Sequence, residues 1–178
     1  MQPILLDRYL AKFDELNILF TDIINAETAE QAVKQFDDIL IDAYIEGFAS
    51  AAYILGDIAV DYNALDNAIN KQYDGVSIQD KAREYYTSKD TESLKALVDS
   101  EYHRVYNTAR DNAYKGHDKK WVTVGDDKVR PTHDFLDGVK VGANERFYTY
   151  DGDSALFPGD FTSAENNANC RCIIDYLP

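Results

Sequence analysis

Three residues in the last third of the sequence carry side chains that bind soft metal ions: His133, Cys170 and Cys172. Two thiolates and one imidazole suit Zn²⁺. A Cys-x-Cys pair on a β-strand directs both thiols to one face, because successive side chains alternate between faces. A tetrahedral site needs a fourth ligand, and His103, His117 or an aspartate are the candidates. These residue types allow a zinc site, although two other interpretations stay open.

The other interpretations use the same three residues. The thiols are small enough to pack in a core, with His133 capping a helix or turn. Alternatively, Cys170 acts as a nucleophile with His133 as its base, which would make the protein a thiol hydrolase or transferase. Standard enzymatic motifs are missing from the sequence, which contains no phosphate loop, GxGxxG, GxSxG, HExxH or CxxC. Asp151-Gly152-Asp153 is more simply a turn than a Ca²⁺ site.

The chain is strongly acidic, with 18 Lys and Arg against 32 Asp and Glu and a formal net charge of −14. Such a surface repels phosphates, which argues against tight non-specific DNA binding by the whole chain. The stretch from Arg104 to Arg130 is locally basic. We interpret this stretch as a mixed, solvated face, and its charge also allows a weak DNA contact.

The 178 residues, 45% hydrophobic and 28% charged, are typical of one folded domain, or of a modest domain with a subdomain. No uncharged apolar run is long enough to cross a bilayer, so we expect no membrane contact. The N-terminus lacks the basic region and cleavage site of a signal peptide. A disulfide between Cys170 and Cys172 would close a small strained ring, so we expect reduced thiols and synthesis inside the cell.

Apolar residues recur every three or four positions through most of the first 115 residues, which predicts helices. Thr28 and Gln31 form a capping-box pattern at the start of the second helix. Gly56-Asp57 indicates a break, Asp74-Gly75 a turn and Gly116 a C-terminal stop. The predicted helices cover residues 4–24, 28 to beyond 55 with a break or kink near Gly56-Asp57, 62–70, 77–86 and 90–115. Small residues at Ala43, Gly47 and Ala51 on the second of these helices let another helix approach closely.

Beyond Gly116 the pattern changes to short β-prone segments. The alternating segment from Trp121 and the turn at Gly125 predict a hairpin over residues 121–130. The predicted fold class is therefore α+β, with a helical N-terminal region (1–90) and a C-terminal domain (91–178) that combines one long helix with a small β-rich unit. Further short strands are predicted at 139–141, 146–150 and 172–176.

Several short motifs follow one another in a specific order between Val98 and Ile174. Together they resemble the phage Mu F-like family of minor head, or head morphogenesis, proteins. Each motif is common by itself, so the resemblance depends on their joint order and spacing. The motifs are Trp121-x-Thr123, Val129-Arg130-x-x-His133, Leu136-Asp137-Gly138 and Asn169-Cys170-Arg171-Cys172.

The resemblance implies a structural protein of a tailed phage or prophage. Family members are minor procapsid components, encoded beside the portal protein and associated with it, and linked to head assembly and DNA packaging or delivery. The implied partners are the portal protein, the major capsid protein or both. The implied location is the virion head or procapsid, after synthesis in the cytoplasm of the bacterial host. Some relatives carry the domain fused to toxins such as ADP-ribosyltransferases, and we expect no such cargo after Tyr176.

We expect structural roles for the residues at the matched positions. Trp121 is expected to anchor the core of the β-rich unit, and its indole N–H needs one hydrogen-bond partner. Gly138 is expected to form a turn with an unusual backbone angle. Arg130 and Arg171 are expected to bridge carboxylates such as Asp137 across the unit.

These observations favour a non-enzymatic minor capsid or head morphogenesis protein that binds portal or capsid subunits. The alternative is a zinc- or cysteine-dependent hydrolase, or a toxin-like effector, that uses His133, Cys170 and Cys172. The two hypotheses differ in the exposure of these residues. An enzyme predicts a concave site open to solvent, whereas a structural module predicts buried residues or a closed four-ligand metal site.

Overall fold

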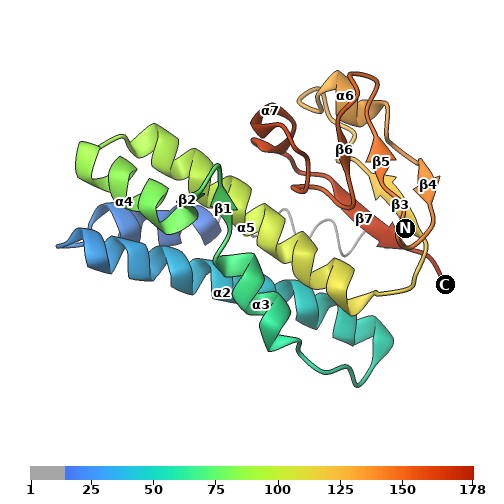
Figure 1. The fold of residues 1–178 in the computed structure, drawn as a ribbon, viewed down its shortest axis with the longest axis horizontal. Coiled ribbons are helices and arrows are strands. Elements are labelled where there is room, and N and C mark those ends of the chain that lie inside the picture. The colour runs from blue at the N-terminus through green and yellow to red at the C-terminus, as the bar shows by residue number, and fades with distance from the viewer. Residues whose placement is uncertain (1–14) are drawn as a thin grey trace.

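The computed structural model describes residues 15–178, and it divides into a layer of long helices and a smaller β-rich unit that meet along helix α5 (Figure 1). This arrangement confirms the predicted α+β class. The part of the predicted first helix that precedes residue 15 lies outside the described residues, and residues 15–24 are helical. The other helices are α2 (Ala29–Leu55), α3 (Tyr62–Ile69), α4 (Ile78–Ser88), α5 (Thr91–Ala113), α6 (Pro131–Asp134) and α7 (Ala164–Asn167).

Helix α2 begins and ends at the predicted signals. The Thr28 hydroxyl accepts a hydrogen bond from the Gln31 backbone N–H at 3.2 Å. The Gln31 side chain in turn accepts from the backbone N–H of Glu27 at 2.9 Å, one residue before the position expected in a capping box. The helix stops at Leu55 because Gly56 adopts a φ of 83°, which an L-residue rarely adopts.

Helices α2 and α5 pack closely because small residues separate them. Ala43, Gly47 and Ala51 are buried on α2. A Cβ atom added at Gly47 would lie 2.3 Å from the backbone oxygen of Tyr106 on α5. The larger side chains around this crossing, including Phe36, fill the helical core. The predicted small-residue stripe therefore positions α5, and α5 in turn carries the β-rich unit.

A short hairpin lies between α3 and α4, where the sequence predicted only a turn. Strands β1 (Gln72–Tyr73) and β2 (Val76–Ser77) pair antiparallel. Asp74 and Gly75 connect them with φ values of 53° and 80°, which are the left-handed conformations that a type I′ turn requires. The Ser77 hydroxyl then caps α4 by accepting from the backbone N–H of Asp80.

Three antiparallel strands form the main sheet of the C-terminal unit, in the order β4-β3-β7. They are β3 (Lys119–Val122), β4 (Lys140–Val141) and β7 (Ile173–Tyr176). A second pair joins β5 (Phe147–Tyr148) to β6 (Ser154–Ala155).

The predicted hairpin over residues 121–130 is wrong. The backbone of Trp121 pairs with Gly138 and Val139 on one side and with Ile174 on the other, so no edge of β3 remains for the residues that follow it. Residues 123–130 instead form a loop that leads into α6.

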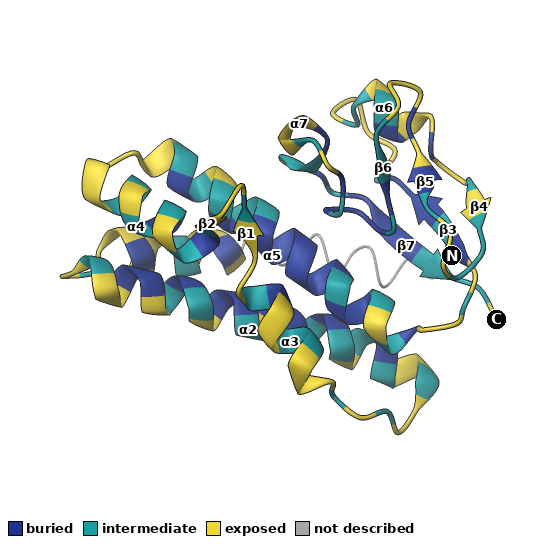
Figure 2. Cartoon of the chain, in the orientation of Figure 1, coloured by how far each residue is buried: buried dark blue, intermediate teal, exposed yellow. Residues whose placement is uncertain are grey.

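The main sheet separates two hydrophobic cores. Val122 and Ile173 pair across the sheet and belong to the helical core. Trp121 and Ile174 pair at the next position and belong to the second core, inside the C-terminal unit. The alternation of side chains along a strand thus gives each face of the sheet its own core. Figure 2 shows buried residues on β3, β7 and the facing side of α5.

The domain boundary at residue 90 stays a prediction. In the described structure α5 packs on α2, and the middle of α5 contacts the C-terminal unit. A Cβ atom added at Gly159, in the loop after β6, would lie 2.9 Å from the Cα atom of Arg104. None of the helices between residues 15 and 178 combines the length and the apolar character that crossing a membrane requires.

Candidate metal centre

The side chains of His133, Cys170 and Cys172 meet inside the C-terminal unit. Nδ1 of His133 lies 3.5 Å from the sulfur of Cys170 and 3.5 Å from the sulfur of Cys172. All three residues are buried, with at most 4% of their surface exposed. The ligand atoms lie within 4.8 Å of one another. The structure thus brings together the three residues that the sequence singled out, and the imidazole faces the thiols instead of capping a helix or turn.

Two short segments place these side chains. His133 lies on α6, which begins with Pro131 at its first turn, a position where proline fits the helix backbone. The Arg130 guanidinium, just before α6, donates hydrogen bonds to the backbone oxygens of Glu165 and Ala168. These bonds tie α6 to the α7 region, which leads directly into the cysteines.

The cysteines themselves precede strand β7 and do not lie on it. Asn169 has a φ of 53°, a left-handed conformation that asparagine tolerates better than most residues. The N–H of Cys170 closes the turn by donating to the backbone oxygen of Asn167 at 3.2 Å. This turn, and the extended chain after it, direct both sulfurs towards His133.

Aromatic rings enclose the imidazole of His133. The ring of Phe161 stacks on it at a centroid distance of 5.0 Å, and Trp121 approaches it edge-on at 5.6 Å. Trp121 is completely buried, as expected of a core anchor. Its indole N–H forms no regular hydrogen bond among the described residues and lies near the sulfur of Cys172, where it favours the thiolate form. The surroundings therefore exclude water and leave an N–H group at a sulfur atom.

The pKa values of the two thiols shift in opposite directions. Burial disfavours the Cys170 thiolate, but interactions with Cys172, His103 and His133 outweigh it and hold the pKa of Cys170 well below its ordinary value. The hydrogen bond to Cys170, together with burial, raises the pKa of Cys172 well above its ordinary value. A bound cation would stabilise the thiolate form of both cysteines.

Neither histidine that was a candidate for the fourth ligand belongs to the cluster. Helix α5 buries His103, with 1% of its surface exposed, and the side-chain nitrogen of Asn107 lies 3.3 Å from its Nε2. His117 pairs through Nδ1 with the backbone oxygen of Leu177 at 2.9 Å. Among the described residues, the ligand group therefore consists of His133, Cys170 and Cys172.

The space next to the cysteines and His133 is very small. A cavity of about 10 Å³ lies between the loop at residues 124–130, His133 and the segment 169–172. This volume is close to the minimum that holds a single water molecule. A single ion fits there, whereas an organic substrate does not. His133, Cys170 and Cys172 are buried, as the hypothesis of a structural module predicts.

Two of the expected ion pairs have other partners. Arg171 forms a two-pronged pair with Asp126, at 2.8 and 2.7 Å, and Arg130 binds backbone oxygens as described above. The Asp137 carboxylate bridges to neither arginine and accepts from the backbone N–H of Thr123 at 2.8 Å, which fixes the chain where β3 ends. The predicted ion pair between Asp137 and an arginine is therefore wrong, because the carboxylate binds the backbone at the end of β3. Gly138 has a φ of 76°, as its predicted turn requires.

The basic stretch from Arg104 to Arg130 is not the solvated face that we expected. Three of its seven cationic side chains, Arg104, Arg110 and Lys119, are buried. Arg104 pairs with Glu101 at 2.7 Å, and Lys119 lies 3.7 Å from Asp111. Burial is possible because these charges are paired inside the junction between α5 and the C-terminal unit. A weak DNA contact through this stretch stays a prediction, with fewer exposed cations to support it.

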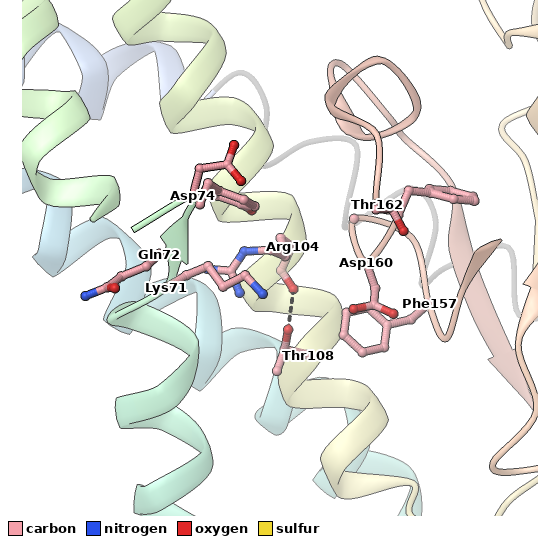
Figure 3. Close-up of a pocket in the computed structure, with 11 residues that line it drawn as sticks. Lys71, Gln72, Asp74, Arg104, Thr108, Phe157, Asp160 and Thr162 are labelled. Carbon is pink, nitrogen blue, oxygen red and sulfur yellow. Dashed lines mark hydrogen bonds between the residues drawn. The ribbon is translucent and has the colours of Figure 1, made fainter. Parts of the chain in front are cut away.

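A polar hollow lies at the same junction, between α5 at Arg104 and the loop that carries Phe157 and Asp160 (Figure 3). Its volume is about 330 Å³. Lys71 and Asp74 line it from the helical side, and Phe157 and Asp160 line it from the C-terminal side. Both positive and negative side chains line the hollow, so its charge favours neither anions nor cations.

Comparison with known proteins identifies the family. Residues 62–175 match the family described as Phage Mu protein F like protein. The match covers more than half of the chain, from α3 to strand β7, and includes every residue of the candidate metal centre. The chain belongs to the Phage Mu F-like family. The resemblance based on the ordered motifs is thus confirmed, and the Mu F-like chain is related to phage head morphogenesis proteins.

One curated protein shares a short segment with this Mu F-like chain. A stretch of 54 residues is 44% identical to NAD(+)--arginine ADP-ribosyltransferase EFV of Enterococcus faecalis (strain ATCC 700802 / V583). The stretch covers 30% of this chain, and the chain spans only 11% of the length of that protein. No solved structure matches the chain.

Proposed function

We propose that this protein is a minor component of a phage or prophage head that binds portal or capsid subunits during head assembly and takes part in DNA packaging or delivery. It acts in the procapsid or virion head as a non-enzymatic structural module, after synthesis in the bacterial cytoplasm. The family match over residues 62–175 carries this proposal, because it covers the C-terminal unit and the helix that supports it.

An exposed aromatic patch on the C-terminal unit supports binding to a protein partner. We define the patch as Phe135, Tyr148 and Tyr150, whose exposed fractions are 58%, 65% and 62%. The rings of Phe135 and Tyr150 contact each other edge to face at 5.8 Å. Aromatic side chains dominate the binding energy of protein interfaces. The patch lies within the family match, and we assign it to the portal subunit.

The acidic surface supports the same kind of partner. A net charge of −14 repels DNA and attracts basic protein surfaces. Association with a portal or capsid subunit should therefore slow as the salt concentration rises, because salt screens the attraction between exposed charges. The aromatic contacts are less sensitive to salt and set the dissociation rate.

Co-expression with the portal protein and the major capsid protein from the same phage genome tests the proposal. We expect the chain to co-purify with the portal protein and to be present in isolated procapsids by mass spectrometry. The double substitution Phe135→Ser/Tyr150→Ser should weaken portal binding at least about tenfold. Tyr53→Ser/Tyr62→Ser is the matched control, since both tyrosines are exposed but lie in the helical layer, at the end of α2 and the start of α3. A folded chain that binds neither protein and is missing from procapsids would overturn the proposal.

The short match to an ADP-ribosyltransferase does not change this assignment. It covers a small part of that protein, and the cavity beside the cysteines is too small for a nucleotide or a peptide. We expect the purified chain neither to release nicotinamide from NAD⁺ nor to hydrolyse thioester or ester substrates through Cys170. Turnover that disappears in Cys170→Ser while the fold persists would favour the enzyme hypothesis instead.

A further inference from the structure

We infer that His133, Cys170 and Cys172 bind a zinc ion that fastens helix α6 to the segment before β7. The inference is independent of the portal partner, because it concerns the chain by itself. Its failure and the failure of the proposed function are therefore separate outcomes.

The ligand spacing fits a tetrahedral ion. Bond lengths of about 2.3 Å for Zn–S and 2.0–2.1 Å for Zn–N place sulfur and nitrogen roughly 3.5–3.6 Å apart when the angle between them is tetrahedral. The two observed distances from His133 Nδ1 to the sulfurs are both 3.5 Å. A Zn²⁺ ion can therefore enter between the three atoms with little movement of the chain.

Hydrogen bonding alone explains the cluster less well. A neutral imidazole nitrogen has one lone pair or one N–H group, so Nδ1 of His133 satisfies one sulfur fully and not two. Nε2 of the same ring is buried and has no hydrogen-bond partner among the described residues. The indole N–H of Trp121 faces Cys172, and a thiolate bound to a metal is a better acceptor for it than a thiol. The two sulfurs and the indole N–H are therefore more favourable around a cation, whereas Nε2 gains no partner from it.

The donor set selects the metal, and the cavity limits what else can reach it. Two sulfur ligands and one nitrogen ligand favour Zn²⁺ over harder ions such as Mg²⁺ or Ca²⁺. Three protein ligands leave one tetrahedral position for a water molecule. The cavity beside the cysteines has room for about one water molecule and for no organic substrate, so the ion would serve the fold.

Such a site would supply what the C-terminal unit lacks. Its strands are two to four residues long, and small units of this kind depend on disulfides or metals for stability. The ligands come from α6 and from the segment before β7. One ion would therefore join two parts of the chain that are far apart in sequence.

The first test measures zinc in the full chain, purified from cells grown with added zinc. We expect close to one zinc per chain by elemental analysis, and at least a tenfold lower content in Cys170→Ser/Cys172→Ser and in His133→Ala. His117→Ala is the matched control, because this histidine pairs with a backbone oxygen outside the site, and its zinc content should be unchanged. Less than a tenth of a zinc per wild-type chain, with both thiols reduced or joined in a disulfide, would overturn the inference.

The second test keeps the inference falsifiable when a variant fails to fold. Wild-type protein stripped with a chelator should lose about 10 °C or more in Tm and regain it with Zn²⁺. Co²⁺ in place of Zn²⁺ should give sulfur-to-metal charge-transfer bands and the visible bands of a tetrahedral ion. Cys170→Ser/Cys172→Ser should lose the charge-transfer bands. The absence of both kinds of band in cobalt-loaded wild type would exclude the site.

Discussion

The helical layer and the C-terminal unit are stabilised by different kinds of interaction. The helical core consists of long apolar stripes on α2, α4 and α5, whose members lie three or four residues apart. The second core is smaller, and its members come from loops and short strands that are distant in sequence. Hydrogen bonds between side chains and the backbone replace much of the missing regular structure. Arg130 donates such bonds, and Asp137 and Asp153 accept them. Burial of periodic apolar residues stabilises the helical layer, whereas the C-terminal unit depends in addition on specific polar contacts.

A pair of large-to-small substitutions tests this difference most directly. Trp121→Ala in the second core and Phe36→Ala in the helical core should each cost about 3–5 kcal/mol, because both side chains are completely buried. Amide hydrogen exchange should place the two losses differently. Trp121→Ala should reduce protection in β3, β4 and β7 and leave α2 and α4 protected. Equal loss of protection throughout the chain would contradict the separation into two cores.

The close crossing of α2 and α5 provides the next prediction. Gly47→Ala should cost about 3 kcal/mol in the free energy of unfolding, because the added Cβ would lie 2.3 Å from a backbone oxygen that cannot move without shifting α5. Gly142→Ala is the matched control, since its added Cβ meets only the flexible Glu145 side chain, at 3.3 Å. Denaturant unfolding of both variants measures the difference. A Gly47→Ala protein as stable as the Gly142→Ala protein would show that the helices can separate freely.

The Asp153 carboxylate provides a test based on pH. It accepts hydrogen bonds from the backbone N–H groups of Thr162 and Ser163 and from the Asn166 side chain. Burial opposes ionisation, but these bonds outweigh it and hold the pKa of Asp153 well below its ordinary value. Asp153→Asn should cost about 2 kcal/mol near neutral pH.

The pH dependence follows from the lower pKa in the folded state. The stabilisation by Asp153 is complete above the ordinary aspartate pKa of about 3.9 and is lost as the pH falls through the lower folded value. The difference between wild type and Asp153→Asn should therefore shrink in acid, as urea unfolding at several pH values can show. Asp127→Asn, at an exposed position, is the control and should change little. A difference that grows in acid would contradict the assignment.

The smallest effect is expected at the turn before the cysteines. Asn169→Ala should cost about 1 kcal/mol, because its φ of 53° is unfavourable for a residue with an ordinary Cβ. Asn169→Gly should be close to neutral, since glycine adopts this conformation freely. Thermal unfolding of the three proteins measures both. If both substitutions were equally costly, the asparagine side chain and not the backbone angle would be responsible.

The same division explains what could be predicted from the sequence. Helix starts, stops and small-residue contacts depend on neighbours within one or two turns, so Thr28, Gly56 and the stripe at Gly47 were predicted correctly. Strand pairing depends on partners far along the chain. The alternating segment from Trp121 was correctly predicted as a strand, but its partners are β4 and β7 and not the residues that follow it.

The candidate site shows the same limit. His133, Cys170 and Cys172 were grouped correctly because their chemistry is distinctive. His103 was one of several candidates for a fourth ligand, and its place outside the cluster depends on how α5 packs. The sequence carried no signal for this, because Glu101, His103, Arg104 and Asn107 are residue types of a solvated face, whereas the structure buries residues 101–107.

The pairing of β7 with β3 also determines the order in which the protein can form. Lys119 pairs with Tyr176, so the main sheet cannot close until almost all of the chain beyond α5 has been synthesised. Contacts in the helical layer link segments that leave the ribosome earlier, and domains generally fold from the N-terminal side during synthesis. Long-range strand pairing is also slower than helix packing. During translation the helical layer is therefore expected to be the platform on which the sheet, and with it the cysteine segment, is assembled last.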